Sequence, residues 1–413
     1  MLNSHKKTIY EILGRNPIHP FPARMAAGIA LEAIAETKAS LKILDPMVGS
    51  GTVVAVAHAK GHRAYGIDLD PLSVLLAGVW THAVNADRVS SVASDVMDRA
   101  RNTFRKLSAA NAYPDGSDEE TQKFLRYWFD AYARRQLMAL SSEIFRVKDK
   151  AVRDVLWAGF SRLIITKTAG ASLAMDLSHS RPHRAFQNAP VKPFNRFLGS
   201  VEAVVANCPR EQSGSTPPPA IVTEGDARTL NIESSSIDLV LTSPPYLNAI
   251  DYLRCSKFSL VWMGYTAAQL RLIRKQSVGT EASSKQAQDV SWITAIINDL
   301  ALQPPLAARH NARLSQYVWD MDRALAETSR VLRVGGRAVY VVGDSTVRGT
   351  FIRNSAIVAA VAHKHGLVLN SQESRDLPPN RRYMPPPKRG GASTAMDGRM
   401  RQEVVLSFDK VGA

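Results

Sequence analysis

A hydroxyl, two prolines and an aromatic ring follow one another directly after an apolar run in the second half of the chain. They are Ser243, Pro244, Pro245 and Tyr246. Neither proline can donate a backbone hydrogen bond, so the tetrapeptide cannot continue a central strand. The rings instead fix the direction of the main-chain carbonyl beside the serine hydroxyl. The sequence therefore predicts a rigid turn at the carboxyl end of a strand, with two oxygen acceptors beside an aromatic ring.

A second group of candidate residues surrounds a glycine turn near the start of the chain. An acid ends one expected strand, two glycines make the turn, a helix follows, and a second acid ends the next strand about twenty residues later. These candidate ligand-binding residues are Asp45, Pro46, Gly49, Gly51, Thr52 and Asp68. In an open parallel sheet, the first strand-to-helix turn is where a nucleoside ligand binds.

The glycine turn differs from the G-x-G-x-x-G turn of dinucleotide-binding proteins. Asp45 would also repel a pyrophosphate, whereas Asp68 can accept hydrogen bonds from ribose hydroxyls. Two acids with a glycine turn suit a ligand that carries an ammonium group and no phosphate, and S-adenosylmethionine is such a ligand. Upstream, the proline-rich segment around His19 could hold the methionine carboxylate of that cofactor. The alternative is that this segment only leads into a helix.

Short apolar strands alternate with helical segments from residue 41 onwards, which is typical of an α/β sheet. The expected strands are residues 41–45, 63–70, 220–226, 238–243, 337–344, 367–370 and 404–408. The expected helices include residues 52–60, a helix capped by Asp70, and residues 317–332 and 355–364. A turn is expected at residues 334–336.

An interruption of about 130 residues separates the second helix from the third strand, far more than an ordinary connection. It carries helical patterns and a proline-rich exit at residues 213–220. The sequence therefore predicts a cofactor-binding half at residues 1–84, an inserted subdomain at 85–219 and a catalytic half at 220–413. A shorter insertion is expected from residue 265 to about residue 313.

Four motifs in this order, DPMVGSGT, GIDLDP, EGDAR and TSPPY, resemble the DNA amino-methyltransferases. These enzymes methylate cytosine N4 or adenine N6 with S-adenosyl-L-methionine. The resemblance covers the cofactor and catalytic halves. It implies a Rossmann-like methyltransferase fold, with a seven-stranded, mostly parallel sheet and a mainly helical inserted subdomain.

The resemblance also implies roles for the strand-end residues. An exocyclic amine on a heteroaromatic ring is a poor nucleophile, because its lone pair is delocalised. The Ser243 hydroxyl and the Pro244 carbonyl would accept hydrogen bonds from that amine and localise the lone pair, while Tyr246 would stack on the flipped base. Asp226 could contact the cofactor adenine, although a turn acid is the alternative. No metal or covalent intermediate is needed.

The serine favours cytosine N4 over adenine N6, because adenine enzymes of this family more often carry aspartate or asparagine there. Methylation of cytosine C5 needs a cysteine nucleophile beside the proline, and neither Cys208 nor Cys255 holds that position.

Recognition of the DNA sequence is expected mainly in the insertion. Arginine suits guanine and phosphate, and a basic proline-rich loop near the C-terminus could contact phosphates. The candidate DNA-binding residues are Arg181, Arg184, Lys192, Arg196, Arg381 and Arg382. The alternative is a solvated basic loop that only packs on the domain.

The formal charge of +15 indicates a polyanionic partner, here double-stranded DNA. The two cysteines suit neither a disulfide framework nor a zinc site. The sequence predicts no signal peptide and no membrane span, so the chain is expected to be cytoplasmic. A cognate restriction endonuclease is a further expected partner, and the oligomeric state stays open.

Two other functions compete with DNA methylation. They are an RNA base-amine methyltransferase and a catalytically silent DNA-binding scaffold.

Overall fold

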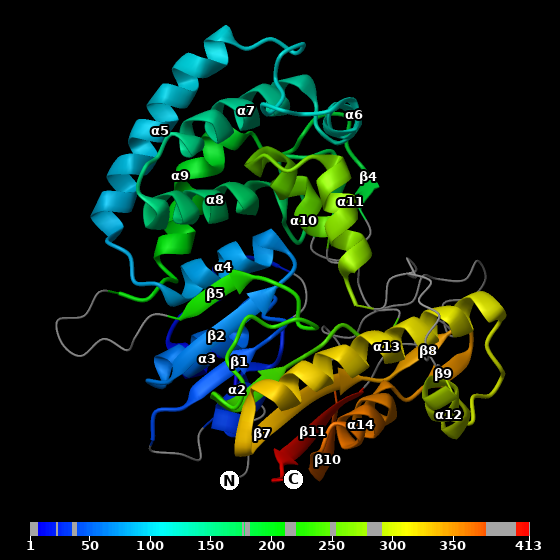
Figure 1. Cartoon of the computed structure of the whole chain (residues 1–413). Coiled ribbons are helices and arrows are strands. Elements are labelled where there is room, and N and C mark those ends of the chain that lie inside the picture. The colour runs from blue at the N-terminus through cyan, green and yellow to red at the C-terminus, as the bar shows by residue number, and fades with distance from the viewer. Residues whose placement is uncertain are drawn as a thin grey trace. The chain divides into compact units, whose positions relative to one another are not determined.

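The computed structural model describes residues 7–21, 24–34, 39–175, 177, 182–210, 220–247, 253–278, 291–376 and 402–412. Figure 1 shows its helices and strands coloured along the chain. The chain divides into two compact units. The first comprises Met1–Ser40, Val48–Glu224 and Asp251–Arg274, and the second comprises Leu41–Met47, Gly225–Ile250 and Lys275–Ala413. The three-part division at residues 84 and 219 stays a prediction.

A seven-stranded sheet has the strand order β10-β11-β7-β6-β1-β2-β5. Its strands are β1 (Lys42–Asp45), β2 (Arg63–Asp68), β5 (Ile221–Glu224), β6 (Ile237–Thr242), β7 (Leu332–Gly343), β10 (Leu367–Asp376) and β11 (Gln402–Lys410). The pairs β1–β6, β6–β7 and β2–β5 are parallel, whereas β11 is antiparallel to β7 and to β10. The expected fold class, a mostly parallel seven-stranded sheet with helices, is confirmed.

The first unit is mainly helical and contains the long insertion. Its helices are α1 (Ile9–Leu13), α2 (Ala27–Ile34), α3 (Thr52–Ala59), α4 (Pro71–Thr81), α5 (Ala86–Lys106), α6 (Glu119–Trp128), α7 (Ala131–Phe145), α8 (Lys150–Ile164), α9 (Pro193–Val205), α10 (Leu253–Leu260), the short 3₁₀ helix η3 (Val261–Met263) and α11 (Ala267–Gln276). Helices α5, α7, α8 and α9 pack together (Figure 1). Several begin at an aspartate or asparagine whose side chain accepts a hydrogen bond from the first turn, as at Asn85, Asp130 and Asp149. The mainly helical character expected of the insertion is confirmed.

The apolar core of the first unit joins the insertion to the segment after Tyr246. Buried side chains of α5, α7, α8 and α9 form one cluster with those of α10 and η3, including Phe160, Phe258 and Trp262. A two-stranded ribbon, β3 (Ala174–Met175) with β4 (His183–Arg184), lies in the same unit. Segments far apart in the sequence thus share one core.

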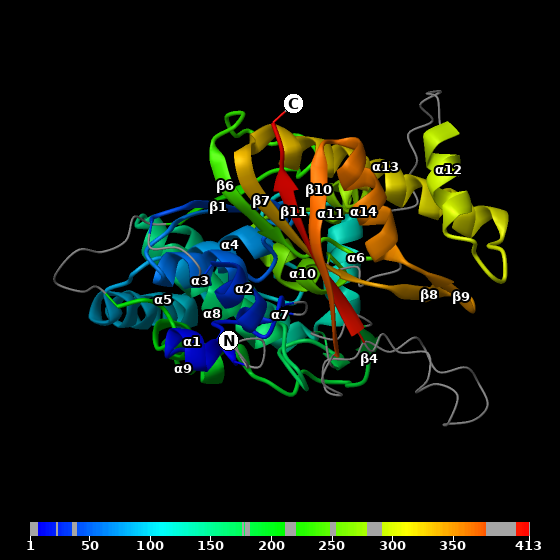
Figure 2. The same cartoon turned by 90° about the horizontal axis from the view of Figure 1, so that it is seen from below.

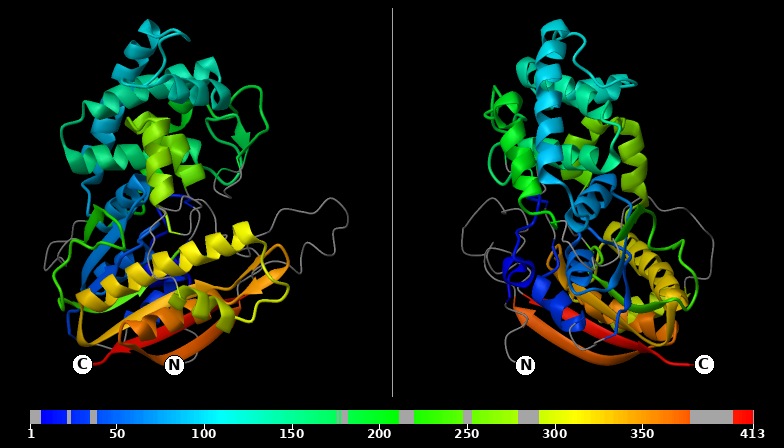
Figure 3. Two further views of the ribbon diagram at one scale, coloured as in Figure 1. Left: turned by 45° about the vertical axis from the view of Figure 1, so that its right-hand side comes forward. Right: turned by 90° about the vertical axis from the view of Figure 1, so that its left-hand side faces the viewer.

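In the second unit, α13 (Ala308–Val331) and α14 (Asn354–Lys364) pack against each other and against β7 (Figures 2 and 3). A short helix, α12 (Ser291–Asp299), and a hairpin of β8 (Ser345–Val347) and β9 (Thr350–Ile352) complete the unit. The interior strands are apolar on both faces, since Val339, Tyr340 and Val341 are all buried.

Strand β7 begins earlier than expected. A turn was expected at residues 334–336, but the strand continues through it from Leu332. Gly335 has a φ of 72°, and the register between β6 and β7 shifts between Ile237 and Leu239. The glycines therefore form an irregularity within the ladder rather than a separate turn.

Within the described residues, no helix has the length and apolar character needed to span a membrane.

Candidate active site

Ser243 follows the last residue of β6 and lies in the second unit. Its Oγ donates a hydrogen bond to the main-chain carbonyl of Val341 on β7, at 3.1 Å, and lies 3.2 Å from the Tyr246 hydroxyl. A serine hydroxyl has one proton, and the carbonyl can only accept it. Tyr246 must then be the donor to Ser243. Both side chains are half-buried, and the turn brings them together as the sequence predicts.

A buried pair lies at the neighbouring strand end. Thr242 Oγ1 donates to Asp45 Oδ1 at 2.7 Å, and the amide of Met47 donates to the same oxygen at 3.1 Å. The pairing of Ile43 with Leu239 and Leu44 with Val240 sets β1 beside β6, so their carboxyl ends meet. The strand order reverses at this point, and open α/β sheets bind ligands where it does so. Asp45 and Ser243 therefore flank the topological switch point.

The glycine turn lies in the first unit, and it contacts the expected acid. Gly49 and Gly51 have φ values of 48° and 86°. The amide of Gly49 donates to Asp68 Oδ2 at 2.8 Å, and the amide of Asp70 donates to Asp68 Oδ1 at 2.9 Å. Burial raises the pKa of the Asp68 carboxyl, and these amides oppose the shift because they stabilise the charged form.

Asp70 does more than the helix cap expected from the sequence. Its Oδ1 accepts from the amide of Leu72 in the first turn of α4, and its Oδ2 accepts from the hydroxyl of Ser256 on α10 at 2.6 Å. Burial, together with the charge of Asp68, raises the pKa of Asp70 to about 7. A serine almost two hundred residues away in sequence gives no signal by which sequence reasoning could find this pair.

His19 is deeply buried in the first unit. Its Nε2 lies 3.0 Å from the hydroxyl of Ser161, which is 2.8 Å from the hydroxyl of Ser259. Burial lowers the pKa of His19 well below its usual value, and Arg162 and Arg24 lower it further, so the ring is neutral at pH 7. Within the described residues, its Nδ1 is buried without a hydrogen-bond partner. The expected contact with a cofactor carboxylate stays a prediction.

The remaining cofactor candidates lie in the turns where the sequence predicts them. Pro46 stands in the turn after β1, and the buried Thr52 opens α3. Asp226 is tied to Arg228, because Nε of Arg228 is 2.9 Å from Oδ1 and Nη2 is 2.7 Å from Oδ2. Arg228 also pairs with Asp320 at 2.6 Å. Asp226 thus has a structural role, and its contact with adenine stays a prediction.

The candidate DNA-binding residues are spread over different elements. The guanidinium of Arg184 lies 5.5 Å over the ring of Tyr127, and Lys192 Nζ lies 5.4 Å over Tyr132. Arg196 is exposed on α9. Arg181, Arg382 and Arg381 lie outside the described residues.

Both cysteines are buried thiols without a disulfide in the described part of the chain. Burial raises the pKa of Cys208 to about 12 and that of Cys255 still further. A raised pKa disfavours the thiolate that a nucleophile requires. No group of three metal-ligating side chains occurs among the residues that the structure describes.

The strand order and its reversal at β1 define an open α/β protein of the Rossmann-like class. No family model matches the chain. Over 378 residues the chain is 22% identical to the Type II methyltransferase M.MvaI of Kocuria varians, covering 84% of this chain and 81% of that protein. The resemblance to methyltransferases that the motifs predict is confirmed by this relative.

Two solved structures are also similar in part. A candidate DNA modification methylase from Thermus thermophilus, complexed with S-adenosyl-L-methionine, is 19% identical with a TM-score of 0.25, and the match covers 46% of this chain and 52% of that one. The chain thus spans about half the length of that protein. Geranyl diphosphate C-methyltransferase from Streptomyces coelicolor A3(2) is 10% identical with a TM-score of 0.33, covering 93% and 77%. Because both TM-scores are below 0.5, the fold class is assigned from the strand order of this chain alone.

Proposed function

We propose that this protein is an S-adenosylmethionine-dependent DNA methyltransferase that acts on the exocyclic amine of a flipped base, with cytosine N4 favoured over adenine N6. One observation carries the proposal. Ser243 has its only proton engaged by the Val341 carbonyl, so its oxygen is an acceptor toward everything else near it. The N–H group of an amine needs such an acceptor, and the apolar strand before Ser243 holds the serine oxygen in a fixed place.

The residues present fit S-adenosylmethionine in their chemistry. Asp45 and Asp68 would repel a phosphate, whereas carboxylates suit a cationic ligand that carries ribose hydroxyls. In the first unit, the turn at Gly49 and Gly51 and the Asp68 carboxylate would hold the nucleoside, and the neutral His19 would use its buried Nδ1 as a hydrogen-bonding group for the methionine end. When bound, this cofactor supplies an electrophilic methyl group.

The protein's own contribution is to orient and polarise the amine. Two N–H bonds of the amine donate to Ser243 Oγ and to the Pro244 carbonyl, which localises the nitrogen lone pair. The lone pair would then form the new N–C bond as the methyl–sulfur bond of S-adenosylmethionine breaks. The sulfur would keep the bonding electron pair and leave as S-adenosylhomocysteine, and the proton that the nitrogen loses would go to solvent. Tyr246 holds the base by stacking, which selects a flipped base over a paired one. The catalytic gain is mainly proximity and orientation.

Two features favour an amine over a ring carbon as acceptor. A serine precedes the two prolines, where methylation of C5 would need a cysteine. Cys255, the cysteine nearest in sequence, is a fully buried thiol whose pKa is raised by burial. The similarity to the Type II methyltransferase of Kocuria varians supports methyl transfer. A cognate restriction endonuclease stays a prediction.

The test is transfer of labelled methyl from S-adenosylmethionine to duplex DNA, with total tRNA as the competing acceptor. We expect label in DNA with the wild-type protein and none above background with Ser243→Ala. Label in tRNA alone would make the protein an RNA methyltransferase. Cofactor binding without transfer to either acceptor would make it a silent scaffold. Either result overturns the proposal.

A further inference from the structure

Helices α10 and α11 of the first unit carry a group of basic residues that has no role in the proposed chemistry at Ser243. Residues 253–274 contain Arg254, Lys257, Arg271 and Arg274 and no acidic residue. Lys257 lies on α10, and Arg271 and Arg274 lie three residues apart on α11, so they share one side of that helix. Arg254, Arg271 and Arg274 are exposed, and Lys257 is half-buried.

Cations of the two helices repel one another. Burial lowers the pKa of Lys257, and the neighbouring charges of Arg271 and Arg274 lower it further, while Glu120 on α6 acts against them. Glu120 also forms an ion pair with Arg271. The charges that shift the pKa of Lys257 are therefore those of two arginines and one carboxylate, and that carboxylate is paired with Arg271. A bound polyanion would stabilise the charged form of Lys257.

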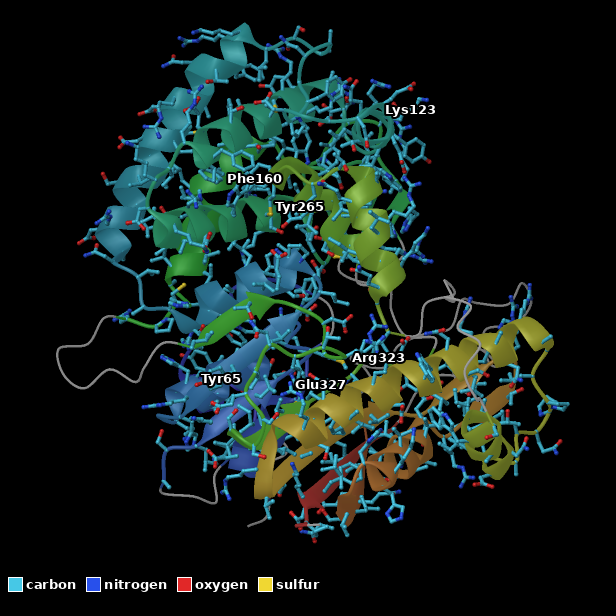
Figure 4. All side chains as sticks on the ribbon, viewed as in Figure 1. Tyr65, Lys123, Phe160, Tyr265, Arg323 and Glu327 are labelled. Atoms are coloured by element: carbon cyan, nitrogen blue, oxygen red, sulfur yellow. The ribbon has the colours of Figure 1, made fainter. Side chains whose placement is uncertain are left out.

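Aromatic contacts connect this basic group to Arg184. Lys257 Nζ lies 4.3 Å over the ring of Phe124 on α6. From Phe124 the ring contacts pass through Phe258 and Trp128 to Tyr127, at centroid distances of 5.1, 5.0 and 4.9 Å. The guanidinium of Arg184 covers Tyr127, which is 53% exposed. Helix α6, which carries Phe124 and Tyr127, also carries Lys123 at its exposed side (Figure 4).

We propose that this face is where the protein holds the phosphate backbone of duplex DNA. Its cations are Arg184 of β4, Lys257 of α10, and Arg271 and Arg274 of α11; we call it the α6/α10/α11 face. The inference rests on the proposed function and deepens it, because it locates the DNA contacts on the segment after Tyr246 as well as on the insertion. Cations gathered on one face are what a phosphate backbone requires, and the ring contacts hold Lys257 and Arg184 in place on it.

The face is tested by the salt dependence of DNA binding. Anisotropy of a fluorescein-labelled duplex of random sequence, titrated with the full-length protein at several salt concentrations, gives the slope of log affinity against log salt. Each phosphate contact contributes about 0.9 to that slope on duplex DNA. For Arg271→Gln/Arg274→Gln we expect the slope to fall by about 2 and affinity at low salt to weaken about tenfold or more.

The matched control is Arg101→Gln/Arg105→Gln, which removes two exposed arginines from α5 in the same unit. An unchanged slope in the α11 variant, or an equal fall in the control, would overturn the inference. So would a wild-type protein that binds tRNA with these arginines but not duplex DNA. If the wild-type protein methylates DNA while the α11 variant binds it normally, the face alone has failed. If the wild-type protein neither binds nor methylates DNA, the proposed function has failed with it.

Discussion

At the scale of single residues, the proposed chemistry depends on which oxygen atoms keep a free lone pair. The Val341 carbonyl takes the Ser243 proton, and the Tyr246 hydroxyl donates to the same serine oxygen. A serine oxygen has two lone pairs, so the Tyr246 hydroxyl can occupy one of them and leave the second for the amine of the proposed mechanism. The two hydrogen bonds within the protein keep the serine oriented before a base arrives.

We expect Ser243→Ala to lower kcat by about 100- to 1,000-fold, the usual effect of removing one oriented hydrogen-bonding group from a reacting centre. The Kd for S-adenosylmethionine should not change, because in the proposed mechanism the serine contacts the amine and not the cofactor. Single-turnover methylation and calorimetric titration of the cofactor measure the two effects. Ser236→Ala is the control, since that half-buried serine precedes β6 and donates to the Glu233 carbonyl. Equal losses in both variants would contradict the role of Ser243.

The ring and the hydroxyl of Tyr246 have separable roles. Tyr246→Ala should lower kcat/KM by about 10- to 100-fold, because base–aromatic stacking contributes about 1–3 kcal/mol. Tyr246→Phe keeps the ring and removes only the hydrogen bond to Ser243, so its kcat/KM should stay well above that of the alanine variant. A phenylalanine variant as defective as the alanine variant would show that the hydroxyl, and not the stacking ring, matters.

At the scale of elements, close packing of α4 against the glycine turn requires Gly51. A Cβ there would lie 2.8 Å from the Cα and Cβ of Ala77, and the φ of 86° disfavours any other residue. Gly51→Ala should therefore destabilise the protein by about 2 kcal/mol or more. Gly78→Ala on the same helix meets no atom within 4 Å and should raise helix stability by up to about 1 kcal/mol. Urea unfolding compares them, and equal stabilities would contradict the packing.

The cap of α4 should make stability depend on pH. Asp70 has a pKa of about 7 in the folded protein, against 3.8 for the ordinary carboxyl. The folded state then holds a proton that the unfolded state loses between these values, so this contribution to the free energy of unfolding falls as pH rises from about 4 to about 7. Asp70→Asn should flatten that decline, measured by urea unfolding at several pH values. Ser256→Ala should extend the decline to higher pH, because it removes a hydrogen bond to the charged carboxylate. An unaltered profile in Asp70→Asn would contradict this role.

The elements nearest the site were largely predictable from the sequence, and their long-range partners were not. β1, β2 and β6 end at or close to the residues expected, because short apolar runs stop at Asp45, Asp68 and Thr242. The contacts from Ser256 to Asp70 and from Lys257 to Phe124 join segments far apart in the chain, where local periodicity carries no information. The sequence does not predict the face of α10 and α11 for this reason, because contacts between distant segments bring its cations together.

At the scale of the whole molecule, the formal charge of +15 gives the chain a long-range attraction for polyanions. That attraction selects no base, because phosphate contacts position a protein on DNA without reading sequence. The chemistry must then be selected by the turn at Ser243. Binding and methyl transfer are therefore separable: arginine variants of the α6/α10/α11 face should change salt dependence, and Ser243 variants should change kcat.

The most direct measurement is the chemical position of the transferred methyl group. Duplex DNA is incubated with the protein and methyl-labelled S-adenosylmethionine, digested to nucleosides and resolved by mass spectrometry. We expect the label on an exocyclic amine, as N4-methylcytosine in preference to N6-methyladenine, and its loss in Ser243→Ala. Label at cytosine C5, or undiminished label in Ser243→Ala, would contradict the proposal that this serine polarises an amine.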